Sequence, residues 1–244
     1  MTHHSYFTGF GGFDFAAKLQ GIDTTLQCER DTFCRKFCNY FFPDVIIHKD
    51  IYSIDKKQVN YATIASAGFP CQNISESGDN TGIYGQKSKA VWQFLDIAFT
   101  VGYKYLLLEN SAKLTIRGLD KLLCAFSENG YDAQWSCLRA SDFGYSHKRE
   151  RIFVVAYPHQ NRLPCKLFLP VETTRLYSAP KKANETFLRI TEKAIHTEGN
   201  YLDLCGVNGF PRNFRKIIAG LGNAVNITMA EYLFFCIKEF DKTI

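Results

Sequence analysis

Long apolar runs are missing from this chain of 244 residues, and so is an apolar leader at its N-terminus. A membrane-spanning helix needs roughly 20 consecutive apolar residues. No stretch of the sequence approaches that length, which excludes an integral membrane protein. The first seven residues carry neither the basic start nor the apolar core of a secretory signal. We therefore expect a soluble, cytoplasmic chain.

Paired metal-ligand motifs are also missing. The nine cysteines are an odd number and are scattered along the chain. Without an export signal they indicate a reducing compartment rather than a disulfide framework. Cys34 and Cys38 could share a helix face, but no second CxxC or HxxxH element accompanies them, so we expect no metal site.

Several cysteines and aromatic residues are expected to serve packing alone. Buried small apolar side chains are predicted for Cys28, Cys34, Cys38, Cys124, Cys137 and Cys236. Core positions are predicted for Trp92, Trp135, Tyr103 and Tyr105.

The composition is that of a folded domain with a locally uneven charge. Apolar residues make up 46% and charged residues 22%, which excludes intrinsic disorder. Of the formal net charge of +5, all lies in residues 157–216, which hold ten Lys and Arg against five Asp and Glu. This segment is either a solvated surface or a surface that meets a polyanion.

Short apolar runs alternate with amphipathic stretches up to residue 157, a pattern typical of βαβ units. Strands are predicted at residues 5–7, 24–28, 45–48, 61–67, 103–108 and 152–156. The clearest helices are predicted at residues 90–101, 119–129 and 229–240. We expect a doubly wound, Rossmann-like α/β domain over residues 1–157. It is followed by a small irregular insertion at 158–216. A segment at 217–244 then docks back on the domain.

Polar or reactive residues follow four of the predicted strands: Glu29, Asp50, Cys71 and Glu109. Each of them alone could be a turn or a helix cap. In open α/β sheets, however, ligands bind beyond the carboxyl ends of the strands. Four such residues at one edge therefore predict a common crevice.

A glycine-rich turn, Phe7-Thr8-Gly9-Phe10-Gly11-Gly12, follows the first strand and opens a helix. Its glycines permit positive φ and a close approach of the backbone to a ligand, but the turn departs from GxGxxG. Glu29 could accept hydrogen bonds from ribose hydroxyls, and Asp50 and Ile51 could hold an adenine ring. Together these features fit an adenosyl cofactor, although Phe7 and Ile51 could equally belong to the core.

Three kinds of reactive group are expected to converge in the same crevice. Cys71 lies in a loop directly after a strand, where a thiolate could act as a nucleophile. Glu109 supplies a carboxyl group from a neighbouring strand end, and Arg149 or Arg151 supplies a cation. Such a set suits addition to an electron-poor ring.

These blocks together resemble those of the DNA (cytosine-5)-methyltransferases. Residues 7–12 resemble the family's S-adenosylmethionine (AdoMet) loop, and Pro70-Cys71-Gln72 matches its nucleophile motif. Three further blocks follow in the family's order: Glu109-Asn110, Arg149-Glu150-Arg151 and Gly222-Asn223-Ala224-Val225. The sequence departs from the family pattern at Ser111, at His147, at Asn226-Ile227 and in the short insertion.

The resemblance implies AdoMet-dependent methylation of cytosine C5 in double-stranded DNA. Cys71 would add to C6 of a flipped-out cytosine, with Glu109 at the exocyclic amine and N3, and with Arg151 and Arg149 at O2 or a nearby phosphate. Asn223 would support the cofactor site. The insertion at 158–216 would be a small target-recognition region. Substrate contacts are expected from Gln72, Ser75, Lys181, Lys182, Arg212 and Arg215.

The resemblance also implies a biological setting, a restriction–modification or phage self-protection system in a bacterial or phage-infected cell. A monomer is expected, with a cognate restriction endonuclease as a genetic partner. Two alternatives remain open: an RNA (tRNA) cytosine-5 methyltransferase and a catalytically silent DNA-binding relic.

Overall fold

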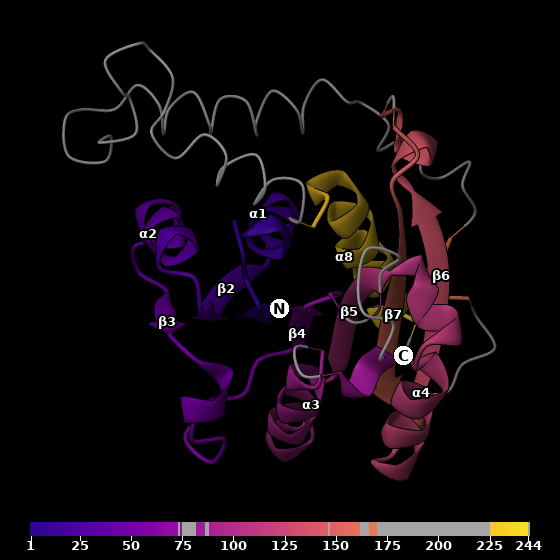
Figure 1. Cartoon of the computed structure of the whole chain (residues 1–244), viewed down its shortest axis with the longest axis horizontal. Helices are drawn as coiled ribbons and strands as arrows, with labels where there is room; N and C mark the ends of the chain where they lie inside the picture. Colours follow the sequence, from indigo (N-terminus) through magenta and orange to yellow (C-terminus); the bar gives the residue numbers. More distant parts are fainter. Residues whose placement is uncertain are drawn as a thin grey trace.

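The computed structural model describes residues 1–72, 74, 82–85, 88–145, 147–161, 166–169 and 225–243. Within these ranges, seven strands form one sheet in the order β3-β2-β1-β4-β5-β7-β6 (Figure 1). Strands β1 to β5 pair parallel, whereas β7 runs antiparallel to both of its neighbours. The strands are β1 Thr2–Tyr6, β2 Asp23–Cys28, β3 Ile46–His48, β4 Ile64–Gly68, β5 Tyr105–Ser111, β6 Tyr131–Arg139 and β7 Glu150–Pro158.

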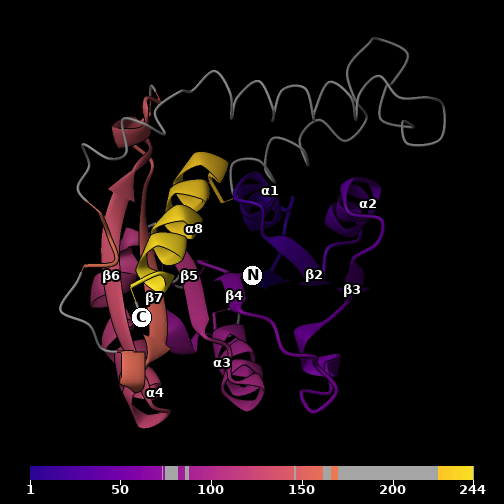
Figure 2. The same cartoon turned by 180° about the vertical axis from the view of Figure 1, so that it is seen from behind.

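Helices cover both faces of the sheet (Figures 1 and 2). Helices α3 (Ala90–Val101) and α4 (Leu119–Glu128) pack on one face, and α1 (Gly12–Leu19) and α8 (Ile227–Asp241) pack on the other. Helix α2 (Thr32–Phe41) joins α1 through a separate cluster of phenylalanines. Short 3₁₀ turns are η1 Ile51–Ser53, η2 Gly82–Tyr84, η3 Ala112–Ile116, η4 Ala140–Phe143 and η5 His159–Asn161.

Strand β5 shows why the sheet is sandwiched between helices. Leu106 and Leu108 lie in the cluster shared with α3 and α4, whereas Tyr105 and Leu107 lie in the cluster shared with α1 and α8. All four side chains are buried. Because side chains alternate between the faces of a strand, an unbroken apolar run requires cover on both sides.

The expected doubly wound α/β fold is confirmed. Helix α3 has the predicted bounds, and the C-terminal helix docks on α1 and the sheet, as expected. Strand β6 and helix α2 were not among the predicted elements. The division of the chain at residues 157 and 216 stays a prediction, because residues 170–224 lie outside the described ranges.

Three side chains predicted to be buried are exposed. Trp135 is 47% exposed, and Cys124 and Cys137 are also exposed. Trp135 and Cys137 lie on β6, which is the edge strand of the sheet formed by the described residues and is poorly covered. Cys34 is half-buried in α2, and Trp92 is partly buried against the core. The predictions for Tyr103 and Tyr105 are correct.

In the described part of the chain, no helix has the length and apolar character needed to cross a membrane.

Candidate active site

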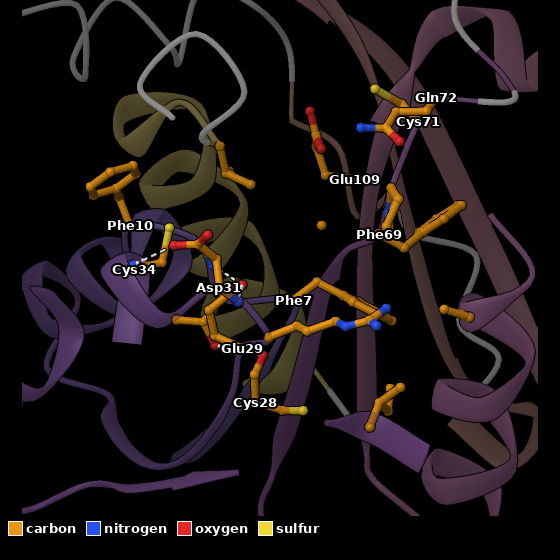
Figure 3. Close-up of a pocket in the computed structure, with 18 of the residues that line it drawn as sticks. Phe7, Phe10, Cys28, Glu29, Asp31, Cys34, Phe69, Cys71, Gln72 and Glu109 are labelled. Atoms are coloured by element: carbon orange, nitrogen blue, oxygen red, sulfur yellow. Dashed lines mark hydrogen bonds between the residues drawn. The ribbon is translucent and has the colours of Figure 1, made fainter. Parts of the chain in front are cut away.

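The ends of the five parallel strands surround one cavity of about 1030 Å³. Its wall includes all four residues that the sequence placed at strand ends: Glu29, Asp50, Cys71 and Glu109. In Figure 3, Cys71 and Glu109 lie at one end of the cavity, Glu29 lies at the other, and Phe7 lies between them. The carboxyl edge of the sheet therefore forms a single crevice, in agreement with the general rule for open α/β sheets.

The glycine-rich turn forms one wall of this cavity and has an unusual backbone. Phe7, Gly9 and Gly11 have positive φ angles of 55°, 56° and 73°. A Cβ placed on Gly9 would meet nothing within 4 Å, so the space beside this backbone is open. A Cβ on Gly12, in contrast, would lie 2.6 Å from the carbonyl oxygen of Val225. The turn therefore touches the C-terminal segment on one side and leaves room for a ligand on the other.

Glu29 connects the glycine-rich turn to the loop that follows β2. Its Oε2 accepts a hydrogen bond of 2.7 Å from the Gly9 N–H, and its Oε1 accepts one of 2.7 Å from the Asp31 N–H. Burial raises the pKa of this carboxyl group above its ordinary value, although these two N–H groups oppose the rise. Each carboxylate oxygen retains a further lone pair for a hydroxyl group of a ligand.

Asp50 and Ile51 line the same wall after β3. The Asp50 carboxylate accepts a hydrogen bond of 3.1 Å from the Tyr52 N–H and so begins the short turn η1. Ile51 is 5% exposed and belongs to the core, and it also lines the cavity, so its contact with a cofactor stays a prediction. Next to it, Tyr52 is exposed and lines the cavity.

Glu109 and Arg151 form an ion pair at the other end of the cavity. The Arg151 Nε lies 3.0 Å from Glu109 Oε1, and the side chains are 23% and 8% exposed respectively. Burial raises the pKa of Glu109, while Arg151 and Arg149 pull it down. Arg149 is half-buried and interacts electrostatically with Glu109 and Cys71, and its own pKa is lowered by burial and by Arg151.

The backbone around Cys71 is held by three successive hydrogen bonds. Asn110 Nδ2 donates to the Phe69 carbonyl at 3.0 Å, and Ser88 Oγ donates to the Pro70 carbonyl at 2.9 Å. The Cys71 carbonyl itself accepts from the Ile74 N–H at 2.8 Å. The site therefore holds a cysteine on a fixed backbone beside a carboxyl group with a raised pKa. This combination is suited to addition and proton transfer.

The other expected contact residues are only partly covered by the structure. Gln72 lines the cavity next to Cys71 (Figure 3). Ser75, Lys181, Lys182, Arg212, Arg215 and Asn223 lie outside the described residues.

The departures from the family pattern have plain local roles. Ser111 lines the cavity and accepts a hydrogen bond of 3.4 Å from the Lys113 N–H. Asn226 caps α8 by accepting from the Met229 N–H at 3.1 Å. His147 is exposed, and its ring packs against Tyr145 at 5.5 Å between centroids.

Cys34 and Cys38 both lie on α2, and the Cys38 thiol donates to the Gly9 carbonyl at 3.3 Å. In the described ranges, no three His, Cys, Asp or Glu side chains are grouped as metal ligands would be.

Sequence reasoning missed Ser88 and Lys89, which lie where α3 begins. Lys89 lines the cavity and Ser88 is fully buried. A serine just before a predicted helix signals a helix cap. Nothing in the local pattern indicates that its hydroxyl group reaches back to Pro70, eighteen positions earlier.

Comparison with known proteins identifies a family whose model matches almost the whole chain. The family model of the C-5 cytosine-specific DNA methylases matches residues 1–228. Type II methyltransferase M2.BsuMI of Bacillus subtilis (strain 168) is 28% identical over 160 residues, which cover 62% of this chain and 41% of that protein. Type II methyltransferase M.Sau3AI of Staphylococcus aureus is 32% identical over 144 residues, which cover 54% of this chain and 34% of that protein. The chain thus spans less than half the length of these two relatives.

Two solved structures have the same fold. A mutant of Spodoptera frugiperda DNMT2 has a TM-score of 0.65 and 15% identity, covering 96% of this chain and 98% of that one. The Dnmt2 methyltransferase of S. pombe has a TM-score of 0.59 and 17% identity, covering 73% of this chain and 56% of that one. At these identities the likeness concerns the fold alone. The match of the family model over nearly the full length, however, shows that the chain belongs to the C-5 cytosine-specific DNA methylase family.

Proposed function

We propose that this chain methylates C5 of cytosine in double-stranded DNA and uses AdoMet as the methyl donor. One observation carries the proposal: a single cavity is lined both by the glycine-rich turn and by Cys71 and Glu109. A cofactor on the turn and a base at Cys71 would then share one cavity. The family match supports this assignment.

The cofactor would lie against the turn that contains Gly9, Gly11 and Gly12. The open space beside Gly9 fits a ligand there, and the Glu29 carboxylate has the chemistry to accept hydrogen bonds from ribose hydroxyls. Asp50 and Ile51 would hold the adenine, Phe7 would form the wall between the two ends of the cavity, and Asn223 would support the site. When bound, AdoMet supplies an electrophilic methyl group.

Cys71 would activate the base. C5 of cytosine is a weak nucleophile, and addition of the Cys71 thiolate to C6 converts the ring into an enamine with electron density at C5. After C5 has been methylated, loss of its proton to water or a base expels the Cys71 thiolate and restores the aromatic ring. The cysteine is thus regenerated in every cycle.

Glu109 would supply the proton that balances this addition. When sulfur attacks C6, negative charge develops toward N3, and a protonated Glu109 can transfer its proton there. Burial raises the pKa of Glu109 and so favours the protonated form. Arg151, which lies 3.0 Å from the carboxyl group, would stabilise the carboxylate left behind, and Arg149 adds a second positive charge.

The target base would have to leave the helix, because C6 is inaccessible inside stacked DNA. Gln72 and Ser75 would contact the flipped nucleotide beside Cys71. The excess of basic residues in 157–216, Lys181, Lys182, Arg212 and Arg215 among them, would neutralise phosphates of the duplex. Type II methyltransferases among the relatives support a role in restriction–modification or in phage self-protection, with a cognate restriction endonuclease as a genetic partner.

A competition assay tests the substrate assignment. The purified chain is incubated with tritium-labelled AdoMet and equal amounts of duplex DNA and tRNA, and bisulfite sequencing then locates any modified cytosine. We expect label in DNA at C5 of cytosine within a short recurring sequence. Label confined to tRNA would show the alternative RNA methyltransferase. Tight DNA binding without AdoMet turnover would show a silent relic.

A further inference from the structure

Arg117 lies at the end of the 3₁₀ turn η3, which follows directly after β5, the strand that carries Glu109. Its side chain makes a hydrogen bond within the protein. Arg117 Nη1 donates a hydrogen bond of 2.6 Å to the carbonyl of Ile74, three positions after Cys71. Because Ile74 in turn donates to the Cys71 carbonyl at 2.8 Å, a chain of two hydrogen bonds joins the guanidinium to the backbone of Cys71.

The backbone of Arg117 also makes a hydrogen bond, to the backbone of Ile83. Its carbonyl accepts a hydrogen bond of 3.1 Å from the Ile83 N–H. Ile74 and Ile83 themselves are 0% and 1% exposed, so their side chains are packed into the core. A single residue therefore fixes one position on each side of residues 75–81.

The next residue explains how Ile83 comes so close. A Cβ on Gly118 would lie 2.6 Å from Ile83 Cβ, and the φ of Gly118 is +134°. Only glycine leaves room for Ile83 at this point of the chain. Arg117 therefore holds Ile74 and Ile83 by hydrogen bonds, and Gly118 leaves the room that Ile83 needs.

We propose that Arg117 is a positioning residue that sets where the Cys71 thiol lies relative to Glu109. The inference rests on the proposed function for its catalytic consequence, but not for its structural one. A charge-assisted hydrogen bond is stronger than a neutral one, so the guanidinium holds the Ile74 carbonyl more firmly than an uncharged donor would. Arg117 follows η3, the element directly after the strand β5 that carries Glu109. The hydrogen bond from Arg117 to Ile74 therefore fixes the backbone near Cys71 relative to Glu109.

The structural consequence is tested by alkylation of cysteines with iodoacetamide, followed residue by residue with mass spectrometry. Arg117→Met removes the donor and keeps the backbone carbonyl that holds Ile83, whereas Arg117→Lys keeps a positive charge. Lys121→Met, on the exposed side of α4, is the matched control for loss of a cation. The exposed Cys124 provides an internal reference in every sample.

We expect Arg117→Met to change the alkylation rate of Cys71 by about threefold or more, because the partly buried thiol lines the cavity and would no longer be held in one position there. Arg117→Lys should restore most of the native rate, and Lys121→Met should change nothing. Equal rates in the native chain and Arg117→Met would overturn the proposal. Faster alkylation of the buried Cys38 and Cys236 as well would mean general loosening, and would overturn it too.

The catalytic consequence is measured on the same variants by single-turnover methyl transfer to DNA. We expect Arg117→Met to lower the rate by about tenfold, since misplacement of a reacting group by ~1 Å is costly. The dissociation constant for AdoMet should stay unchanged, and Arg117→Lys should recover most of the rate. If even the native chain methylates no DNA, the proposed function fails, while the alkylation rates still decide the role of Arg117.

Discussion

Arg151 Nε lies 3.0 Å from Glu109 Oε1 because their strands are antiparallel neighbours. In this register Arg151 stands opposite Ser111, two positions along β5 from Glu109. Residues two apart share a face of a strand, and a long side chain can reach such a diagonal neighbour. The antiparallel pairing of β7 with β5 thus places the Arg151 guanidinium next to the Glu109 carboxyl group.

Replacement of this carboxyl group tests its role as a proton donor. Glu109→Gln keeps the size of the side chain and a hydrogen-bond donor, but it cannot transfer a proton to N3. We expect a loss of about 10² to 10⁴ in the methyl-transfer rate, the usual range for general acid–base catalysis. AdoMet affinity, measured by calorimetry, should be unchanged because the cofactor is expected to lie at the other end of the cavity. A variant with native activity would contradict the assignment.

Gly12→Ala tests the packing between the glycine-rich turn and the C-terminal segment. In an ordinary helix the change from glycine to alanine is favourable by about 1 kcal/mol. Here the new Cβ would lie 2.6 Å from the Val225 carbonyl oxygen, so we expect a lower melting temperature and weaker AdoMet binding instead.

Gly21→Ala is the control for this substitution. Gly21 has a φ of +67°, and apart from its two chain neighbours no residue lies within 4 Å of the place that a Cβ would occupy, so only backbone strain is added. We expect a loss of about 1 kcal/mol in stability and native AdoMet affinity. Equal AdoMet affinities in the two variants would contradict a role for the contact with Val225.

Asp14 predicts a specific dependence of stability on pH. This carboxyl group is completely buried, accepts hydrogen bonds from Ser5 and Gln27, and burial raises its pKa from 3.8 to about 6. The folded state therefore holds the proton more tightly than the unfolded state does. The resulting stabilisation is fully present below about pH 4 and is lost as the pH rises through about 6.

Asp14→Asn stays neutral at every pH and should escape this loss. Relative to the native chain, its free energy of unfolding should rise by about 3 kcal/mol between pH 4 and pH 8. Thermal or urea unfolding at several pH values measures the difference. The exposed Asp120→Asn serves as the control for loss of a surface carboxylate. A constant difference between Asp14→Asn and the native chain would show that Asp14 does not titrate in this way.

The positive charge of residues 157–216 predicts a steep salt dependence of DNA binding. Each neutralised phosphate adds about −0.9 to the slope of log K against log salt. We expect alanine at Lys181, Lys182, Arg212 and Arg215 to make the slope less steep, by up to about 1 for each phosphate that is no longer neutralised. Fluorescence anisotropy between about 50 and 200 mM salt measures the slopes. A slope near zero in the native chain would identify a solvated surface.

The sequence predicted those features that depend on local patterns. Apolar periodicity located α3, and the turn chemistry after the strands located Glu29, Asp50, Cys71 and Glu109 around one cavity. Periodicity did not predict β6, where the apolar side chains of Trp135 and Cys137 are exposed. Whether such side chains are buried depends on which strand lies at the edge of the sheet, and the local sequence does not show this.

Contacts between distant residues could not be predicted in this way. Arg117 and Ile74 are 43 positions apart, and Ser88 reaches the backbone beside Cys71 only because the chain returns to it. Neither residue has a local pattern that distinguishes it from an ordinary surface arginine or helix cap. The role of Arg117 depends on the packing of Ile74 and Ile83, which only the folded structure shows.

The most direct test of the account is covalent trapping on duplex DNA that contains 5-fluorocytosine. Fluorine at C5 cannot leave as a proton does, so the adduct between the nucleophile and C6 should persist. We predict a stable protein–DNA complex that requires AdoMet, with the DNA attached to the peptide containing Cys71, and no complex with Cys71→Ser. Formation of 5-methylcytosine by Cys71→Ser at the native rate, or attachment at another residue, would contradict the account.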